Sequence, residues 1–122
     1  MSYLDTIMLI YDTRIQYFGN KEKIFGDKGS DLLKYDPDRF VEAYEMMKMS
    51  LDFTGNSTKP TVLVSYFKSL VKYQRSDATI TKQDVLDAYV QLSDVISYNI
   101  NNNPDYSKYY LSAQKNIENM FA

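Results

Sequence analysis

Three basic side chains recur at helical spacing in the middle of the chain. Lys68, Lys72 and Arg75 are separated by four and three positions, so a helix places them along one strip of its surface. Ser65 and Ser69 accompany them, and no acidic residue lies among them. Such a strip would bind phosphates or an acidic protein surface. The alternative is an ordinary solvated helix face, since exposed charges often contribute little.

A second set of residues forms an apolar stripe. On a helix, Met46, Met49 and Phe53 fall nearly opposite the main apolar face at Met47 and Leu51. A helix that is apolar on two sides is either buried between layers or offers one side to another molecule. Methionine suits adaptable contacts but also fills gaps in cores. We therefore expect a docking or self-association face here, with a sandwiched helix as the alternative.

The composition lacks the side chains on which most catalytic and metal sites depend. The 122 residues include no histidine and no cysteine, the residue types that dominate zinc sites and activated nucleophiles. Asp84, Asp87 and Asp94 would share the polar face of a helix, where acids are usually solvated. We expect no catalytic residue, no metal site, no cofactor and no enzymatic activity. The 12 tyrosines point instead to protein contact, because tyrosine is enriched at interfaces.

Capping signals and apolar periodicity predict an all-α fold, a single-domain bundle of about five helices covering residues 1–122. Ser2 with Asp5 and Thr81 with Asp84 match the capping-box pattern. Asp36-Pro37 and Asn103-Pro104 also mark helix starts, and Gly55 marks a helix end. The predicted helices span residues 2–18, 37–53, 60–75, 82–100 and 104–121.

Residues 19–35 are predicted to form a long connection between the first and second helices. Such connections are uncommon in compact domains and are often functional or partly helical. This one carries four apolar residues, Ile24, Phe25, Leu32 and Leu33. We expect them to fix the crossover to the bundle, with a binding loop as the alternative. Gly26 and Gly29 lack the spacing of a phosphate-binding loop.

The charge distribution is uneven along the chain. The net charge is −2, yet residues 59–82 hold five basic side chains and one acidic side chain. The first residues lack the basic and apolar regions of a signal peptide, and charges interrupt the first apolar stretch. We therefore expect a cytoplasmic protein without a membrane partner. Tyr, Asn, Lys, Ile and Phe, which AT-rich genes favour, fill a large part of the chain, as suits a low-GC bacterium, its phage or a mobile element. For a phage gene, the host cytoplasm or the virion is expected.

Together these features predict a non-enzymatic helical interaction protein. It would be a subunit of an intracellular or viral assembly, or a small regulator docking on a larger protein. Its partner would be another protein or a second copy of the chain. The alternative is a nucleic-acid-associated helical subunit that uses the basic strip, with weak contacts because the rest of the chain is acidic. No motif of a known family is recognised.

Overall fold

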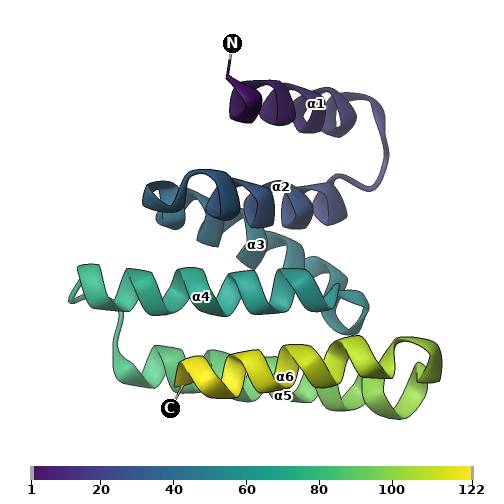
Figure 1. Ribbon diagram of the computed structural model, residues 1–122, viewed down its shortest axis with the longest axis vertical. Coiled ribbons are helices and arrows are strands. Elements are labelled where there is room, and N and C mark those ends of the chain that lie inside the picture. Colours follow the sequence, from purple (N-terminus) through teal and green to yellow (C-terminus); the bar gives the residue numbers. More distant parts are fainter. Residues whose placement is uncertain (1, 122) are drawn as a thin grey trace.

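Helices account for nearly all of residues 2–121, the part of the chain that the computed structural model describes, and no strand occurs in that part (Figure 1). The prediction of an all-α fold is confirmed, but residues 2–121 form six α-helices rather than about five. They are α1 (Tyr3–Tyr17), α2 (Lys21–Tyr35), α3 (Phe40–Thr54), α4 (Pro60–Ser76), α5 (Lys82–Asn102) and α6 (Ser107–Phe121). Three short 3-10 helices, η1 (Pro37–Arg39), η2 (Gly55–Ser57) and η3 (Pro104–Tyr106), precede α3, α4 and α6.

The helix ends follow the local signals of the sequence. The backbone N–H of Asp5 donates to the Ser2 hydroxyl at 3.1 Å, and that of Asp84 donates to the Thr81 hydroxyl at 3.1 Å. In both cases the acidic side chain accepts a hydrogen bond from the N-cap backbone in return. Helix α3 ends at Gly55, whose φ of 53° is one that side-chain-bearing residues rarely adopt. Both predicted capping boxes are confirmed.

The predicted long connection over residues 19–35 is wrong, because Lys21–Tyr35 form α2 and only a short turn separates it from α1. Two glycines made the segment resemble a loop, since glycine costs about 1 kcal/mol in a helix interior. In the fold they allow α2 to approach α3 closely. A Cβ atom at Gly29 would lie 2.8 Å from the carbonyl oxygen of Ala43 and 2.7 Å from Cγ of Met47. The packing of α2 on α3 therefore overrides the local preference against helix.

Helix α4 is the central element of the core. It packs against α2, α3, α5 and α6, and Leu63 and Phe67 are fully buried at its centre. Ile24, Leu32 and Leu33 of α2 are also buried, so three of the four apolar residues expected to fix this segment do so. The remaining members of the core cluster on α3, α5 and α6 are Ala43, Met47, Leu51, Ala88, Leu92, Val95, Ile96, Tyr110 and Ile117.

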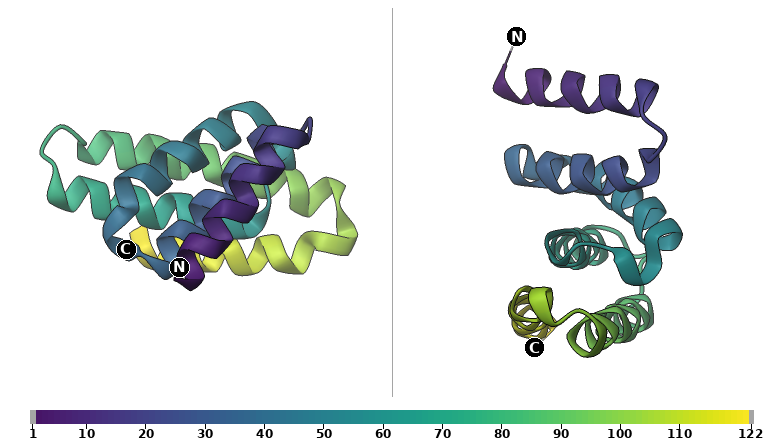
Figure 2. Two further views of the ribbon diagram at one scale, coloured as in Figure 1. Left: turned by 90° about the horizontal axis from the view of Figure 1, so that it is seen from above. Right: turned by 90° about the vertical axis from the view of Figure 1, so that its right-hand side faces the viewer.

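The helices are stacked in layers, with α1 at one end and α5 and α6 at the other (Figures 1 and 2). Within residues 2–121, α2 is the only element that α1 contacts, and α1 has no fully buried residue. Polar contacts assist the α1–α2 packing. The hydroxyl of Tyr11 donates to the carboxylate of Asp31, and the Lys28 ammonium lies 2.6 Å from the Asp12 carboxylate.

Candidate functional site: a tyrosine-lined groove

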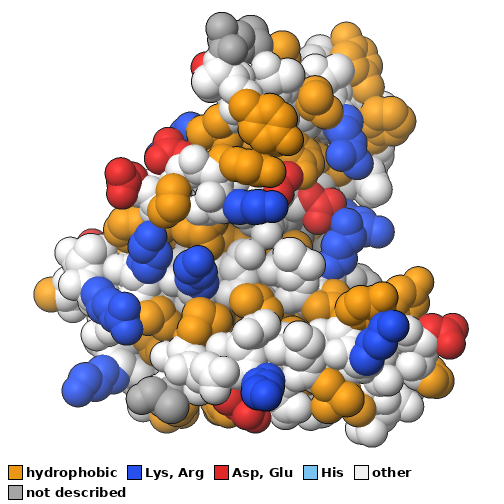
Figure 3. Space-filling view, in the orientation of Figure 1, with side chains coloured by type: hydrophobic (Ala, Val, Ile, Leu, Met, Phe, Trp, Pro, Cys, Tyr) orange, Lys and Arg blue, Asp and Glu red, His pale blue; other side chains and the backbone are white. Residues whose placement is uncertain are grey.

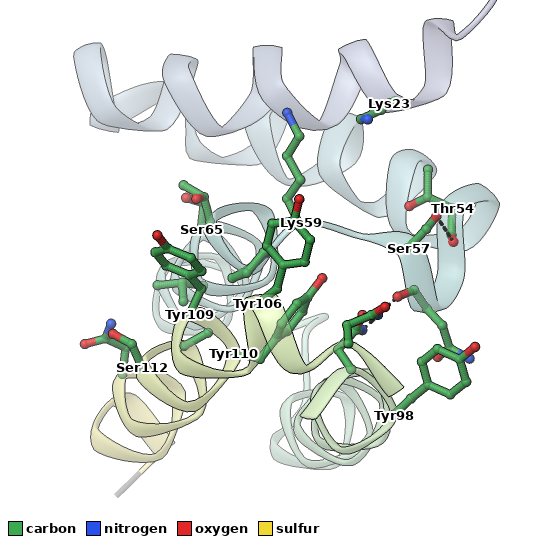
Figure 4. Close-up of a pocket in the computed structure, with 18 residues that line it drawn as sticks. Lys23, Thr54, Ser57, Lys59, Ser65, Tyr98, Tyr106, Tyr109, Tyr110 and Ser112 are labelled. Atoms are coloured by element: carbon green, nitrogen blue, oxygen red, sulfur yellow. Dashed lines mark hydrogen bonds between the residues drawn. The ribbon is translucent and has the colours of Figure 1, made fainter. Parts of the chain in front are cut away.

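An open groove with a volume of about 1110 Å³ lies in the described surface (Figure 4). Its wall combines α4 with η2, the C-terminal end of α5, η3 and α6, and Lys23 of α2 closes one side. Figure 4 shows Lys23 and Lys59 on one side of the groove and Tyr106, Tyr109 and Tyr110 on the other. The groove therefore depends on segments that are far apart in the sequence.

The residues lining the groove are mostly polar but uncharged. They include four tyrosines, four asparagines, three serines, two threonines and two lysines, and no acidic residue. Tyr106 and Tyr109 are 60% and 53% exposed, so most of each side chain is available for contact. Ser112 and Asn116 are exposed, and their side chains form no hydrogen bond to another described residue. The groove thus offers aromatic surface together with open amide and hydroxyl groups.

Buried hydrogen bonds hold the floor of the groove in place. The hydroxyl of Tyr110 donates to the carbonyl oxygen of Thr58 at 2.8 Å, which joins α6 to the segment before α4. The side-chain amide of Asn99 donates to the carbonyl oxygen of Asn56 at 2.8 Å and joins α5 to η2. Burial raises the pKa of Tyr110, so this phenol stays protonated and remains a donor at neutral pH.

Positive charge lies at the α2 side of the groove. The Lys59 ammonium contacts both carboxylate oxygens of Asp27, at 2.9 and 3.1 Å, and both side chains are only partly exposed. Lys23 is exposed and forms no ion pair with another described residue. An anionic group entering from this side would therefore contact the Lys23 ammonium, which is available, and the Lys59 ammonium, which Asp27 already binds.

The predicted basic strip lies on the exposed side of α4. Lys68 and Arg75 are exposed, whereas Lys72 is partly buried. The Lys72 ammonium donates to the carbonyl oxygen of Pro37 at 3.3 Å and lies 5.6 Å from the centre of the Phe40 ring. Figure 3 shows several Lys and Arg side chains crossing the middle of one face, with acidic side chains mostly above this band.

The fold exposes two residues of the predicted apolar stripe on α3 and partly buries the third. Met49 and Phe53 are 47% and 71% exposed, and both point away from the core. Met46 is partly buried and packs against the core, close to Gly29 of α2. Helix α3 is therefore not enclosed on its second side, and α4 takes the central position instead. Met49 and Phe53 remain a surface pair, while Met46 contributes to the α2–α3 contact.

Sequence reasoning did not identify the groove. Its tyrosines were visible as a composition bias, and Tyr106, Tyr109 and Tyr110 are clustered in the sequence. The clustering shows that the start of α6 is aromatic on more than one side. It does not show which other helix packs opposite these tyrosines. The opposing residues, such as Lys59 and Ser65, come from α4 and its entry.

Within residues 2–121, acidic side chains form no cluster that could hold a metal ion. No helix of this part combines the length and the hydropathy needed to cross a bilayer. Comparison of the chain with family models, curated proteins and solved structures finds no match.

Proposed function

We propose that this chain is a non-enzymatic interaction protein that binds a segment of a larger protein in the tyrosine-lined groove. The observation that carries the proposal is the groove's lining. Tyrosine, asparagine and serine surround an open depression in which Tyr106 and Tyr109 are more than half exposed. Binding loops of antibodies use the same residue types for protein recognition.

The tyrosine rings and the amide and hydroxyl groups of the groove make different contributions to peptide binding. A tyrosine ring has only two side-chain torsions, so it provides contact area at a low entropic cost. Amide and hydroxyl groups can both donate and accept hydrogen bonds, as the N–H and C=O groups of a polypeptide require. Ser112 and Asn116 supply such groups beside the rings. A peptide backbone therefore finds partners for both of its polar groups.

The dimensions also favour a macromolecular partner. Sites for small molecules usually enclose about 300 to 1,000 Å³ and are mostly apolar. This groove has about 1110 Å³, is open, and combines tyrosine rings with amide and hydroxyl groups along its wall. These features support a binding role.

A random dodecapeptide library displayed on phage provides a test that needs no known partner. Peptides selected on the wild-type protein are synthesised, and their affinities are measured by fluorescence polarisation. Tyr106→Ala with Tyr109→Ala should weaken binding by at least about tenfold, because central aromatic residues dominate interfaces. The matched control is Tyr3→Ala with Tyr17→Ala, which removes two tyrosines of similar exposure from α1.

The control pair should bind the selected peptides as the wild type does. Failure to enrich any peptide would contradict the proposal. So would peptides whose affinity is the same for the Tyr106/Tyr109 double variant and for the wild type. Circular dichroism of each variant establishes that a loss of binding is not a loss of fold.

A further inference from the structure

The groove and the basic strip lie on one continuous face of α4. Thr61 and Ser65 line the groove, and Lys68, Lys72 and Arg75 follow at steps of three, four and three residues. At 3.6 residues per turn these five positions fall on the same side of the helix. The groove therefore opens along α4 toward the strip, and Lys59 and Lys23 lie at its other end.

Neighbouring helices flank this face of α4. Helix α4 contacts α2 on one side and α6 on the other. The hydroxyls of Ser65 and Ser30 are hydrogen-bonded at 2.8 Å, which fixes α4 to α2 beside the strip. On the opposite side, Tyr109 of α6 lines the same groove. A ligand lying along α4 would therefore contact α2 on one side and α6 on the other.

From these placements we infer that the groove takes an extended acidic segment of another protein, laid along α4 from Lys59 to Arg75. The inference rests on the function proposed above and adds the charge, length and course of the ligand. The face from Thr61 to Arg75 is about 21 Å long at about 1.5 Å per residue. An extended chain of about six or seven residues covers that length at about 3.3 Å per residue.

Charge complementarity decides the chemistry of the ligand. Lys23 and Lys59 line the groove, and none of its described lining residues is acidic. Lys68, Lys72 and Arg75 continue along α4 beyond Ser65, the last α4 residue that lines the groove. Lys68 and Arg75 are exposed and form no ion pair with another described residue. Carboxylates near both ends of a bound segment would compensate these charges, and its middle would contact the tyrosines.

A polypeptide fits this surface better than a single-stranded nucleic acid. A nucleic acid carries one charge per nucleotide and gains most of its affinity by neutralising phosphates. Here the lining of the groove beyond Lys23 and Lys59 is uncharged, so phosphates at successive nucleotides would have no cation to neutralise them along its middle. The open amides and hydroxyls of Asn116 and Ser112 match the alternating donors and acceptors of a peptide backbone.

Asp27 of the same chain binds the Lys59 ammonium in the way that a carboxylate of the ligand would. Because the pair is partly exposed, an incoming carboxylate can replace Asp27 at modest cost. Asp27→Asn removes the competitor and leaves Lys59 available. This variant should therefore bind an acidic ligand about threefold more tightly than the wild type.

Two pools of fluorescein-labelled heptapeptides provide the test. Glu or Asp occupies alternate positions in the acidic pool, Gln or Asn occupies them in the amide pool, and the other positions are randomised identically. The wild-type protein should bind the acidic pool at least about tenfold more tightly at low salt, and the difference should shrink as salt is added. Lys68→Glu with Arg75→Glu should abolish the preference.

The charge-matched control is Lys48→Glu with Lys115→Glu, two exposed lysines outside the groove. It should keep the preference for the acidic pool. An acidic preference that survives Lys68→Glu with Arg75→Glu would overturn the inference, as would equal binding of the two pools. Library peptides that still bind at Tyr106 and Tyr109 in that case leave the proposed function intact.

Labelled oligothymidylate serves as the competing ligand. If it binds the wild-type protein more tightly than the acidic pool does, and if Lys68→Glu with Arg75→Glu removes that binding, the strip recognises phosphates. That outcome replaces the acidic segment with a single-stranded nucleic acid. Weaker binding of the oligonucleotide than of the acidic pool supports the inference.

Discussion

The hydroxyl of Tyr110 donates a 2.8 Å hydrogen bond to the carbonyl oxygen of Thr58, a residue 52 positions earlier in the chain. Both residues are buried, at 5% and 3% exposure. The bond connects α6 to the segment that leads into α4, so it fixes the spacing between two walls of the groove.

Tyr110→Phe removes the donor and leaves the Thr58 carbonyl buried without this partner. An unsatisfied buried acceptor costs about 1–3 kcal/mol, so the free energy of unfolding should fall by that amount. Urea denaturation followed by circular dichroism measures the change. Tyr109→Phe is the control, because that side chain is exposed and its hydroxyl has no partner among the described residues. Equal stability of the two variants would show that the Tyr110 bond is unimportant.

Gly29→Ala should destabilise the protein although alanine is the better helix former. The gain in helix propensity is about 1 kcal/mol. The added Cβ, however, meets a backbone oxygen of α3 that cannot rotate away. Overpacking of this kind costs about 1–3 kcal/mol, so the net change in a urea titration should be a loss of stability.

Gly26→Ala is the matched comparison on the same helix. Its added Cβ would first meet the Ser50 hydroxyl oxygen at 2.6 Å, and a side-chain rotamer can change. The loss of stability should therefore be smaller than for Gly29→Ala. The reverse order would mean that the α2–α3 spacing adjusts more readily than the Ser50 side chain.

Met49 and Phe53 remain a proposed docking or self-association pair on α3. Met49→Lys with Phe53→Gln should leave the free energy of unfolding within about 0.5 kcal/mol, because both side chains are exposed. Any concentration-dependent increase in mass seen by light scattering for the wild type should disappear. Met46→Gln should lower stability instead, since Met46 packs against the core. A wild-type mass that stays constant with concentration would exclude self-association through this pair.

Alkaline pH should unfold the protein through its tyrosines. Burial raises the pKa of Tyr11, Tyr66 and Tyr110 above the ordinary value of 10.0, so the fold favours the neutral phenols. Their contribution is fully present below pH 10 and is lost as the pH rises through the folded-state values. Denaturant titrations at increasing pH, with tyrosinate absorbance as the second signal, should show stability falling above that point.

The same titrations also test how stability depends on pH near neutrality. The chain has no histidine, so no side chain of that type changes charge between pH 6 and 8, and stability should be nearly flat there. Ionisation of all tyrosines together near pH 10 with the fold intact would contradict the raised pKa of Tyr11, Tyr66 and Tyr110.

The sequence by itself determined the helices that local signals define. Capping boxes at Ser2 and Thr81, prolines at helix starts and Gly55 at a helix end are contacts within a few residues, so they can be identified without tertiary information. Apolar periodicity likewise predicted helices over residues 60–75 and 82–100, which are α4 and α5.

Only the tertiary structure decided the identity of α2, the place of Met46 and the existence of the groove. Helix α2 contains glycines at positions 26 and 29 that disfavour a helix locally, and contact with α3 stabilises it nonetheless. The groove joins Lys59 to Tyr109 across 50 residues of sequence. Periodicity shows which side of a helix is apolar, but the neighbour that covers or exposes that side is set by long-range packing.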